Sequence, residues 1–335
     1  MPPNNRYATL LILLSVLVSL VLGIKAPQLA ASTGSFVDPL ILALVFLLFF
    51  ELRFLPVVRA ARHWRFLSIA WIANFILIPT IGWGVASLFL SGQPLFFTGL
   101  LIYFMAPCTD WFLGFTRIAG GNTALGSVLV PINLISQLLL FPVYLSIFAS
   151  AQANVDLSGA AGSLWQWFIL PFITAIAGHQ ILSRILPSSA FSRLMNLSGI
   201  LIPCTLSALV ACIFSANVAT ILSHLSTFAL ILGAVFFFFI LTYYLGEFLT
   251  RRFKLAQPER VLLTMTTAAR NTPLMLALTA AALPDQPIIY AALIIGMLVE
   301  FPHLIALTWL MNRKNSFVNP TLNPPISMKD PLAGN

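Results

Sequence analysis

Two long apolar segments of this chain are each interrupted near the middle by proline and polar residues. The first interruption is Pro-Cys-Thr-Asp at residues 107–110, and the second is Arg-Asn-Thr-Pro at residues 270–273. Charged groups and helix-breaking prolines are costly at membrane depth, so they are found mainly where they line a cavity or a binding site. A matched pair of broken segments, one in each half of a chain, is the best pointer in a sequence to a carrier's substrate site. The interruptions therefore predict a transporter with its site at the two breaks.

Composition places the chain in a lipid bilayer. Hydrophobic residues make up 59% of it, charged residues make up 8%, and the mean hydropathy is +0.98, values that exclude an ordinary soluble domain. The first apolar stretch is too long for the core of a typical signal peptide, so we expect it to remain as a transmembrane helix. Ten stretches are candidates for crossing about 30 Å of hydrocarbon, the second of them short: 7–24, 39–50, 66–90, 95–118, 123–148, 164–186, 194–218, 225–249, 261–283 and 287–311.

Basic residues indicate the orientation of these stretches. Nearly all lysines and arginines fall at the chain ends or in the loops after even-numbered stretches. Lys25 is the only basic residue on the opposite side, where Asp38, Asp156 and Asp285 also fall. Because cytoplasmic loops are enriched in Lys and Arg, we expect a multi-pass protein of the plasma (inner) membrane with both termini cytoplasmic. The net charge of +8 then reflects orientation and does not point to nucleic-acid binding.

Five stretches in each half imply two repeats that enter the membrane with opposite polarity. The predicted fold is an all-α polytopic membrane protein with ten transmembrane helices, arranged as two inverted five-helix repeats in which helices four and nine are broken and cross. The predicted boundaries are residues 1–150 for the first repeat (helices 1–5) and 151–314 for the second (helices 6–10). Residues 315–335, rich in Pro and Asn, are predicted to be a disordered cytoplasmic tail.

Cysteine and histidine give no sign of a metal centre or an enzyme. The three cysteines and four histidines are scattered, so neither a zinc site nor a disulfide framework is implied. No nucleophile–base set or phosphate loop is found either, and we expect no cofactor. Cys204 and Cys212 are interpreted as small buried hydrophobic residues. Cys108 differs, because it precedes the start of a half-helix, whose free N–H groups stabilise a thiolate or a bound oxyanion.

The second break has two readings. In the first, Thr272 is an N-cap, Pro273 is the first helical residue, and Arg270 and Asn271 project into the crossing point. In the second, the helix is continuous but kinked at Pro273, and Arg270 pairs with Asp110 for a purely structural reason, since buried ions are usually paired. Both readings predict the Arg270–Asp110 pair, and only the first predicts access for water.

Four short motifs carry a resemblance to a known family: Ala-Pro-Cys-Thr at 106–109, Val-Pro-Ile-Asn-Leu-Ile-Ser-Gln at 130–137, Thr-Ala-Ala-Arg-Asn at 267–271 and Gly-Met-Leu-Val-Glu-Phe-Pro at 296–302. Over most of its length the chain resembles the arsenite-permease branch of the bile acid/sodium symporter superfamily. The resemblance implies a ten-helix inverted repeat with a panel and a core domain, whose fourth and ninth helices are unwound and cross. It also implies that Cys108 and Glu300 are the functional pair and that Asn133 and Gln137 match the polar residues of helix five.

The chain departs from that family's pattern at both breaks. Arg270, Asn271 and Thr272 stand where the family usually has Ser-Asn-Asn, and Asp110 stands where it generally has an uncharged residue. In sodium-coupled relatives this polar region helps to coordinate Na⁺. A fixed guanidinium would repel that cation, while Asp110 neutralises the guanidinium. The departures argue against sodium coupling and leave the substrate open.

The first functional hypothesis is an efflux permease for arsenite or antimonite that is coupled to the proton gradient. Trivalent arsenic binds thiolate sulfur, and a single thiol at Cys108 gives a contact that also releases its cargo. The alternative for Cys108 is a small buried residue at a helix break. Glu300 lies within an apolar stretch, where desolvation favours the protonated carboxyl and hence proton exchange. His303, one turn away, offers either a proton relay or a structural hydrogen bond to Glu300.

The second hypothesis is a symporter of small organic anions, driven by sodium or protons, in which Arg270 and the half-helix N-termini bind a carboxylate. A membrane sensor built on a carrier fold is a third reading, disfavoured because no segment of the sequence reads as a soluble signalling domain. The expected partners are a small solute, protons or sodium, and the lipid bilayer. Substrate contacts are assigned to polar residues at the breaks and in helix five: Cys108, Thr109, Asp110, Asn133, Gln137, Arg270 and Asn271.

Overall fold

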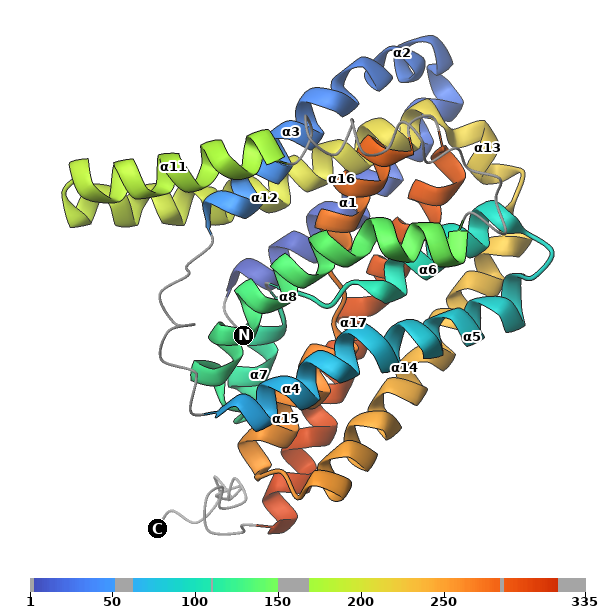
Figure 1. Cartoon of the computed structure of the whole chain (residues 1–335). Coiled ribbons are helices and arrows are strands. Elements are labelled where there is room, and N and C mark those ends of the chain that lie inside the picture. Colours follow the sequence, from blue (N-terminus) through green and yellow to red (C-terminus); the bar gives the residue numbers. More distant parts are fainter. Residues whose placement is uncertain (1–2, 52–62, 110, 150–168, 284–285, 319–335) are drawn as a thin grey trace, which may run out of the picture.

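The computed structural model describes five ranges of the 335 residues: 3–51, 63–109, 111–149, 169–283 and 286–318. These ranges are helical (Figure 1), and within them the only β-structure is an isolated bridge. Of the short elements, η1 is a 3₁₀-helix, and η3 and η4 are π-helical turns. In chain order the elements are α1 (Pro3–Lys25), α2 (Pro27–Ser32), η1 (Thr33–Phe36), α3 (Val37–Phe50), α4 (Trp64–Ile72), η3 (Ala73–Leu77), α5 (Ile78–Leu90), α6 (Pro94–Met105), α7 (Trp111–Ile118), α8 (Thr123–Tyr144), η4 (Leu145–Ala149), α11 (Leu170–Ile185), α12 (Ser188–Ala216), α13 (Val218–Leu222), α14 (Leu225–Phe253), α15 (Gln257–Ala268), α16 (Thr272–Ala282) and α17 (Pro287–Val318).

Within the described residues, six helical runs are long and apolar enough to cross a membrane: Pro27–Phe50, Trp64–Leu90, Thr123–Ile147, Ser188–Ala216, Leu225–Phe253 and Pro287–Arg313. The first of these runs is longer than the stretch predicted at 39–50, because α2 and η1 continue α3 back to Pro27. Two shorter apolar helices, α6 and α16, each form one part of an interrupted stretch. The architecture is that of an all-helical polytopic membrane protein.

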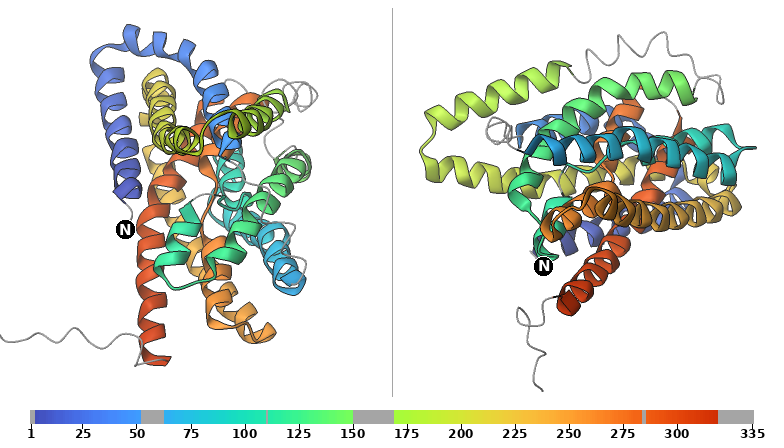
Figure 2. Two further views of the ribbon diagram at one scale, coloured as in Figure 1. Left: turned by 90° about the vertical axis from the view of Figure 1, so that its left-hand side faces the viewer. Right: turned by 60° about the horizontal axis from the view of Figure 1, so that its bottom comes forward.

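The helices pack in two groups, which are visible in the views of Figure 2. In the first group α1 lies along α12, and α3 packs against both α11 and α12. In the second group α6 contacts α5 and α17, and α14 contacts α5, α15 and α17. Contacts between α3 and α16 join the groups. Both interrupted helices belong to the second group.

A run of four phenylalanines on α14 illustrates how the apolar sequence is divided between two surfaces. Phe236 is 62% exposed and Phe237 is 38% exposed, whereas Phe238 and Phe239 are 0% and 1% exposed. Because consecutive residues point in different directions around a helix, the run supplies both an outer apolar face suited to lipid and a packed inner face.

Two glycines allow α6 and α17 to approach each other closely. A Cβ atom added at Gly99 would lie 2.7 Å from the carbonyl oxygen of Ile289 and 2.8 Å from the Cβ atom of Ala292, and one added at Gly296 would lie 2.8 Å from the ring of Tyr103. Cβ atoms essentially never come within 3.0 Å of other heavy atoms. Small residues at such contacts are how transmembrane helices bring their backbones together, and here they hold α17 against the half-helix that precedes the first break.

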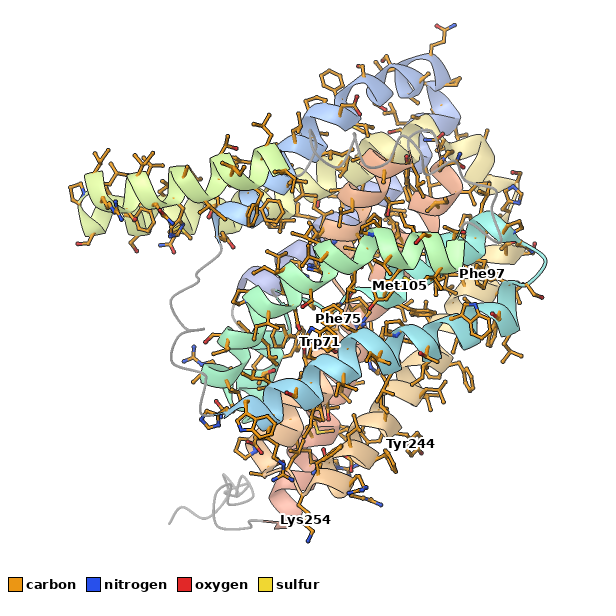
Figure 3. The ribbon with its side chains drawn as sticks, viewed as in Figure 1. Trp71, Phe75, Phe97, Met105, Tyr244 and Lys254 are labelled. Atoms are coloured by element: carbon orange, nitrogen blue, oxygen red, sulfur yellow. The ribbon has the colours of Figure 1, made fainter. Side chains whose placement is uncertain are left out.

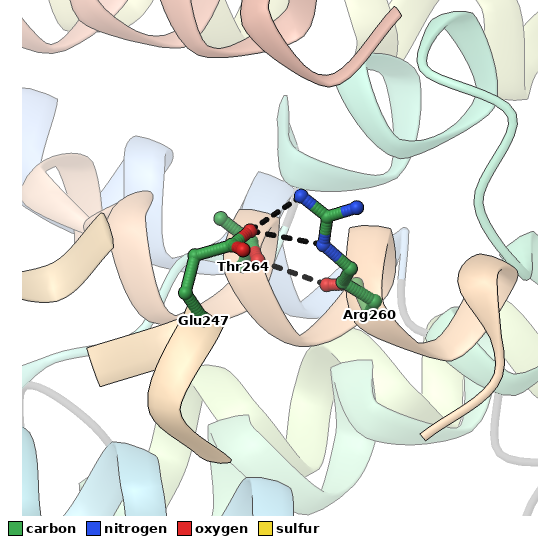
Figure 4. A network of polar contacts seen from close by, with 3 residues as sticks. All are labelled: Glu247, Arg260 and Thr264. Carbon is green, nitrogen blue, oxygen red and sulfur yellow. Dashed lines mark hydrogen bonds and ion pairs between the residues drawn. The ribbon is translucent and has the colours of Figure 1, made fainter. Parts of the chain in front are cut away.

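A polar network holds α15 against α14 at the end of α15 that lies away from the break (Figure 4). Arg260 Nε donates to Glu247 Oε1 at 2.9 Å, and the two side chains form an ion pair. The hydroxyl of Thr264 donates to the carbonyl oxygen of Arg260 at 2.9 Å. One residue before the helix, the N–H of Ala256 donates to the carboxylate of Glu259 at 3.1 Å. The start of α15 is thereby fixed independently of the contacts at the break.

We expect Gly99→Ala to lower the melting temperature of the purified protein, because the added methyl group overpacks α6 against α17. Overpacking a well-packed interior costs about 1–3 kcal/mol. Gly84→Ala on α5 is the matched control, since a Cβ atom there meets nothing within 4 Å and alanine is the better helix former. Thermal unfolding of both variants in one detergent measures the difference. Equal melting temperatures would contradict the close approach of α6 and α17.

Candidate functional site

Both interrupted helices end at the predicted breaks. After α6, Ala106 takes an extended conformation with φ −107° and ψ 113°, and α7 begins only at Trp111. After α15, Ala269 is extended with φ −79° and ψ 140°, and α16 begins at Thr272. The reading of the second break as a continuous, kinked helix is therefore wrong.

The two breaks lie against each other and form a short antiparallel bridge. The N–H of Cys108 donates to the carbonyl oxygen of Ala269 at 3.0 Å, and the N–H of Asn271 donates to the carbonyl oxygen of Ala106 at 3.0 Å. Non-helical backbone at membrane depth is tolerated only where the protein or a water-filled cavity satisfies its polar groups. The predicted meeting of the two breaks is confirmed, and each break satisfies main-chain groups of the other.

Arg270 directs its side chain toward the ends of the preceding half-helices. The residue is 0% exposed. Its Nη1 donates to the carbonyl oxygen of Phe104 at 2.8 Å, and its Nη2 donates to the carbonyl oxygens of Thr267 at 2.5 Å and Thr266 at 3.3 Å. Among the described residues, the guanidinium therefore donates hydrogen bonds to main-chain carbonyl groups and to no side chain. Asp110, the partner expected for Arg270, lies outside the described residues.

Asn271 joins the two breaks a second time. Its Nδ2 donates to the hydroxyl of Thr109 at 3.1 Å, and its Oδ1 accepts from the N–H of Leu274 at 3.4 Å. Asn271 is therefore the N-cap of α16, one residue before Thr272, which was the predicted cap. Asparagine caps as well as serine or threonine, because its side-chain oxygen also reaches the third helical N–H group. Pro273 accordingly takes the second helical position.

Glu300 brings α17 to the crossing. Its side chain is 1% exposed, and Oε1 accepts a hydrogen bond from the N–H of Arg270 at 2.9 Å. His303 does not hydrogen-bond to Glu300 in this structure. Its imidazole stacks on the ring of Phe239, with centroids 3.9 Å apart and planes 2° from parallel, and its Nε2 has no partner among the described residues. The proposed contact between the carboxyl group and the imidazole, as relay or as structural pair, is therefore absent.

A neutral polar cluster lies one turn of α15 before the crossing. The amide nitrogens of Asn74 and Asn133 lie 3.1 and 3.3 Å from the hydroxyl oxygen of Thr266, to which both donate. Gln137 lies one turn after Asn133 on α8 and is 2% exposed. Neither its amide oxygen nor its amide nitrogen has a partner among the described residues. We call Asn74, Asn133, Gln137 and Thr266 the amide cluster.

An unpartnered, buried amide is unfavourable by about 1–3 kcal/mol. Such a group persists in a protein where it serves function or where a solute or water molecule completes its hydrogen bonds. Gln137 thus offers a donor and an acceptor to a small polar solute. The Oδ1 atom of Asn74, which also has no partner among the described residues, adds a second acceptor. The amide cluster carries no formal charge.

Sequence patterns single out Asn133 and Gln137 but not Asn74 or Thr266. The usable signal for Asn74 is that it is an amide inside an otherwise apolar stretch, because a polar residue in a membrane span is by default a functional hypothesis. Asn74 also lies in the π-helical turn η3, a distortion that is frequent at functional sites. That turn and the partners of Thr266 are visible only in three dimensions.

Two contacts hold η3 and the end of α4 against α8. Trp71 and Phe75, which take part in them, are labelled in Figure 3. The Nε1 atom of Trp71 donates to the hydroxyl of Ser136 at 2.9 Å, and the hydroxyl of Tyr144 donates to the carbonyl oxygen of Phe75 at 2.6 Å. These bonds lie on either side of Asn74 in the sequence. They therefore position its amide group opposite α8.

Cys108 is buried, with 1% of its surface exposed, and packs in an apolar cluster that includes Phe112 and Phe115. The other two cysteines lie on α12, where Cys204 is exposed and Cys212 is partly exposed. The prediction that these two are buried is wrong for Cys204, because that face of α12 points outward. Cys108 is thus the one cysteine of the three that lies at the crossing.

A cavity of about 340 Å³ lies between the two groups of helices. Its lining includes Asp38 on α3, Asn217 at the end of α12, Ala280 on α16 and Tyr290 on α17. Because α16 runs from the crossing at Thr272 toward Ala280, the cavity lies at the far end of this half-helix. It is therefore separate from the amide cluster.

We expect Thr266→Val to destabilise the protein by about 1–3 kcal/mol, because the isosteric change leaves the amide nitrogen of Asn133 buried without its acceptor. Thr80→Val is the matched control, since the exposed hydroxyl of Thr80 bonds only to the carbonyl oxygen of Ile76 in its own helix. Chemical or thermal unfolding in detergent measures both variants. A Thr266→Val protein as stable as the control variant would show that the hydroxyl does not hold the amide cluster together.

Comparison with known proteins agrees with this geometry. Residues 39–225, more than half of the chain, match the Sodium Bile acid symporter family. The uncharacterized protein YbaS of Bacillus subtilis (strain 168) is 25% identical over 242 residues, which cover 71% of this chain and 76% of that protein. The probable chloroplastic sodium/metabolite cotransporter BASS2 of Oryza sativa subsp. japonica is 25% identical over 122 residues, 36% of this chain and 29% of that protein. These matches do not point to the arsenite-permease branch. The chain belongs to the Sodium Bile acid symporter family, whose members are membrane transporters and not enzymes.

Proposed function

We propose that this transporter crosses the plasma membrane ten times, as inverted repeats at residues 1–150 and 151–314, with both termini and the tail at 315–335 in the cytoplasm. Support comes from the chain order, in which the broken pairs α6/α7 and α15/α16 take the fourth and ninth positions when α4–α5 counts as one span. Inverted repeats place matched broken helices in this way. The distribution of lysine and arginine supports the orientation.

The cargo of this carrier is arsenite or antimonite, exported from the cell. At neutral pH these metalloids are uncharged hydroxides, which need hydrogen-bond donors and acceptors and no counter-charge. The observation that carries the proposal is the amide cluster beside the crossing: buried, neutral, and with both amide atoms of Gln137 available for a solute. Arg270 is less suited to hold an anionic cargo, because both of its Nη atoms already donate to carbonyl groups and its Nε alone has no partner among the described residues.

Cys108 supplies the soft ligand in this proposal. Trivalent arsenic and antimony bind thiolate sulfur more readily than oxygen. The main chain of Cys108 is bonded directly to the second break through Ala269, so a contact at its thiol is coupled to the geometry of the crossing. A single thiol allows exchange, whereas several converging thiols would retain the metalloid. Thr109, bonded to Asn271, lies next to it and adds a hydroxyl.

Glu300 carries the exchanged proton. Its side chain is buried, and the hydrogen bond from the N–H of Arg270 joins this group to the second break. Protonation and deprotonation of Glu300 therefore act on the same main-chain segment that bonds to Cys108. This is the link by which a proton gradient drives export.

We expect Cys108→Ser to reduce the initial rate of arsenite efflux by about tenfold or more, equivalent to about 1.4 kcal/mol of lost binding or barrier stabilisation. The assay measures intracellular arsenic in cells that lack their own exporter, with membrane amounts of each variant matched by immunoblot. Cys204→Ser and Cys212→Ser are the matched controls and retain full efflux. Undiminished efflux by Cys108→Ser would contradict the proposal that this thiol binds the metalloid. Unchanged intracellular arsenic and antimony on expression of the unaltered protein would contradict the proposal that a metalloid is the cargo.

We expect Glu300→Gln to abolish the stimulation of metalloid transport by a proton gradient while leaving metalloid exchange without a gradient intact. The amide oxygen of glutamine still accepts the N–H of Arg270, but the side chain no longer takes up and releases a proton. Everted vesicles with and without an imposed gradient measure both activities. Glu247→Gln is the matched control, because Glu247 is paired to Arg260 away from the crossing. A Glu300→Gln protein that still responds to the gradient would contradict proton coupling through this group.

A second candidate function is a sodium- or proton-driven symporter of small organic anions. The half-helix α16 begins at the crossing, and helix N-termini favour bound anions. One relative is named a sodium/metabolite cotransporter. Uptake of labelled mono- and dicarboxylates by expressing cells distinguishes the two candidates. If Cys108→Ser takes up carboxylates as fast as the unaltered protein, the organic-anion symporter is supported. If the unaltered protein exports metalloid and Cys108→Ser does not, the metalloid exporter is supported.

A further inference from the structure

The inner ends of α6 and α15 share one positively charged side chain. Where an α-helix ends, its last four carbonyl groups lack partners within the helix. Arg270 reaches Phe104 near the end of α6 with Nη1, and Thr266 and Thr267 near the end of α15 with Nη2. A single guanidinium therefore binds the carbonyl ends of both half-helices that lead into the crossing.

The charges at this point compensate one another. The C-terminal end of a helix carries the equivalent of about −0.5 elementary charge, so two such ends provide about −1 against the +1 of the guanidinium. The Cζ atom of Arg270 also lies 5.8 Å from the ring centroid of Phe238, a distance at which an aromatic face attracts a cation. Among the described residues, carbonyl dipoles and an aromatic ring thus face this fully buried cation, and the carboxyl group of Glu300 is bonded to its main chain.

In carriers with broken helices, unwound carbonyl groups and the C-terminal ends of half-helices coordinate the coupling cation. Here a residue of the chain itself takes those carbonyl groups. We propose that Arg270 is a tethered counter-cation, which occupies the place of a bound monovalent cation and keeps the crossing assembled without Na⁺. The inference rests on the proposed carrier function and adds its ion requirement: this crossing takes no Na⁺ at the half-helix ends.

This role differs from ordinary helix capping in what happens when the side chain is removed. A cap that is lost is replaced by water, whereas an emptied cation site binds a small cation. With a short neutral residue at position 270, the carbonyl oxygens of Phe104, Thr266 and Thr267 still converge, and such oxygens replace the hydration shell of monovalent cations in selective pores. The carboxylate of Glu300, bonded to the main chain of residue 270, lies beside them.

The test measures melting temperatures of the purified full-length protein in detergent, in NaCl, KCl, guanidinium chloride at low millimolar concentration, or choline chloride, at matched ionic strength. A ligand that binds the folded state alone raises the melting temperature in proportion to its occupancy. We expect the unaltered protein to melt at the same temperature in Na⁺ and choline. Arg270→Ser should melt lower in choline and recover several degrees with Na⁺, K⁺ or guanidinium. Arg260→Ser, which loses the ion pair to Glu247, should melt lower without recovery.

Arg270→Lys provides a second variant if the serine protein is too unstable to purify. Its ammonium group restores a tethered charge, so we expect no specific effect of Na⁺ on its melting temperature. Na⁺-specific stabilisation of the unaltered protein or of Arg270→Lys overturns the proposal, as does an Arg270→Ser protein that no cation restores. Because melting temperatures report cation binding without any cargo, these outcomes are independent of whether metalloid or organic anion is transported.

Discussion

The structure depends on one requirement: polar main-chain groups inside a bilayer must find partners within the protein. Two helices are unwound in the second group of helices, and each unwinding leaves N–H and C=O groups that no helix satisfies. The breaks solve this jointly. Cys108 and Asn271 donate across the bridge, Glu300 accepts from the N–H of Arg270, and the guanidinium of Arg270 takes the carbonyl groups of the half-helix ends.

This arrangement decides which groups remain available for a solute. The formally charged Arg270 is engaged with the protein itself, whereas the amide cluster is neutral and includes a glutamine whose amide has no partner among the described residues. Hydrogen-bonding capacity without net charge favours an uncharged hydroxylated cargo over a carboxylate, because an anion in a buried site needs a compensating cation. In the function proposed above, the single thiol at the crossing then selects soft metalloids among such cargoes.

Coupling between the two groups of helices is a second consequence. The half-helix α16 begins at the crossing, runs along α3 of the first group, and ends at the cavity between the groups. Carriers of this type move one bundle against the other around a fixed site. The crossing and the interface between the groups are thus connected by a single helix of 11 residues.

Local chemistry in the sequence was sufficient to place the two breaks, each of which combines proline with polar or charged residues, although Pro131, Pro203 and Pro302 lie inside continuous helices. The inverted order of the ten predicted stretches indicated that the breaks meet. The contacts of individual side chains could not be predicted in this way. Asn271 instead of Thr272 caps α16, His303 stacks on Phe239 instead of bonding to Glu300, and Asn74 and Thr266 join the cluster. Sequence alone determined where the two interruptions lie, because proline and polar residues at those positions are local features of the chain. Only the tertiary structure decided which distant carbonyl groups accept from Arg270 and which amides donate to Thr266, because those contacts depend on how separate helices pack.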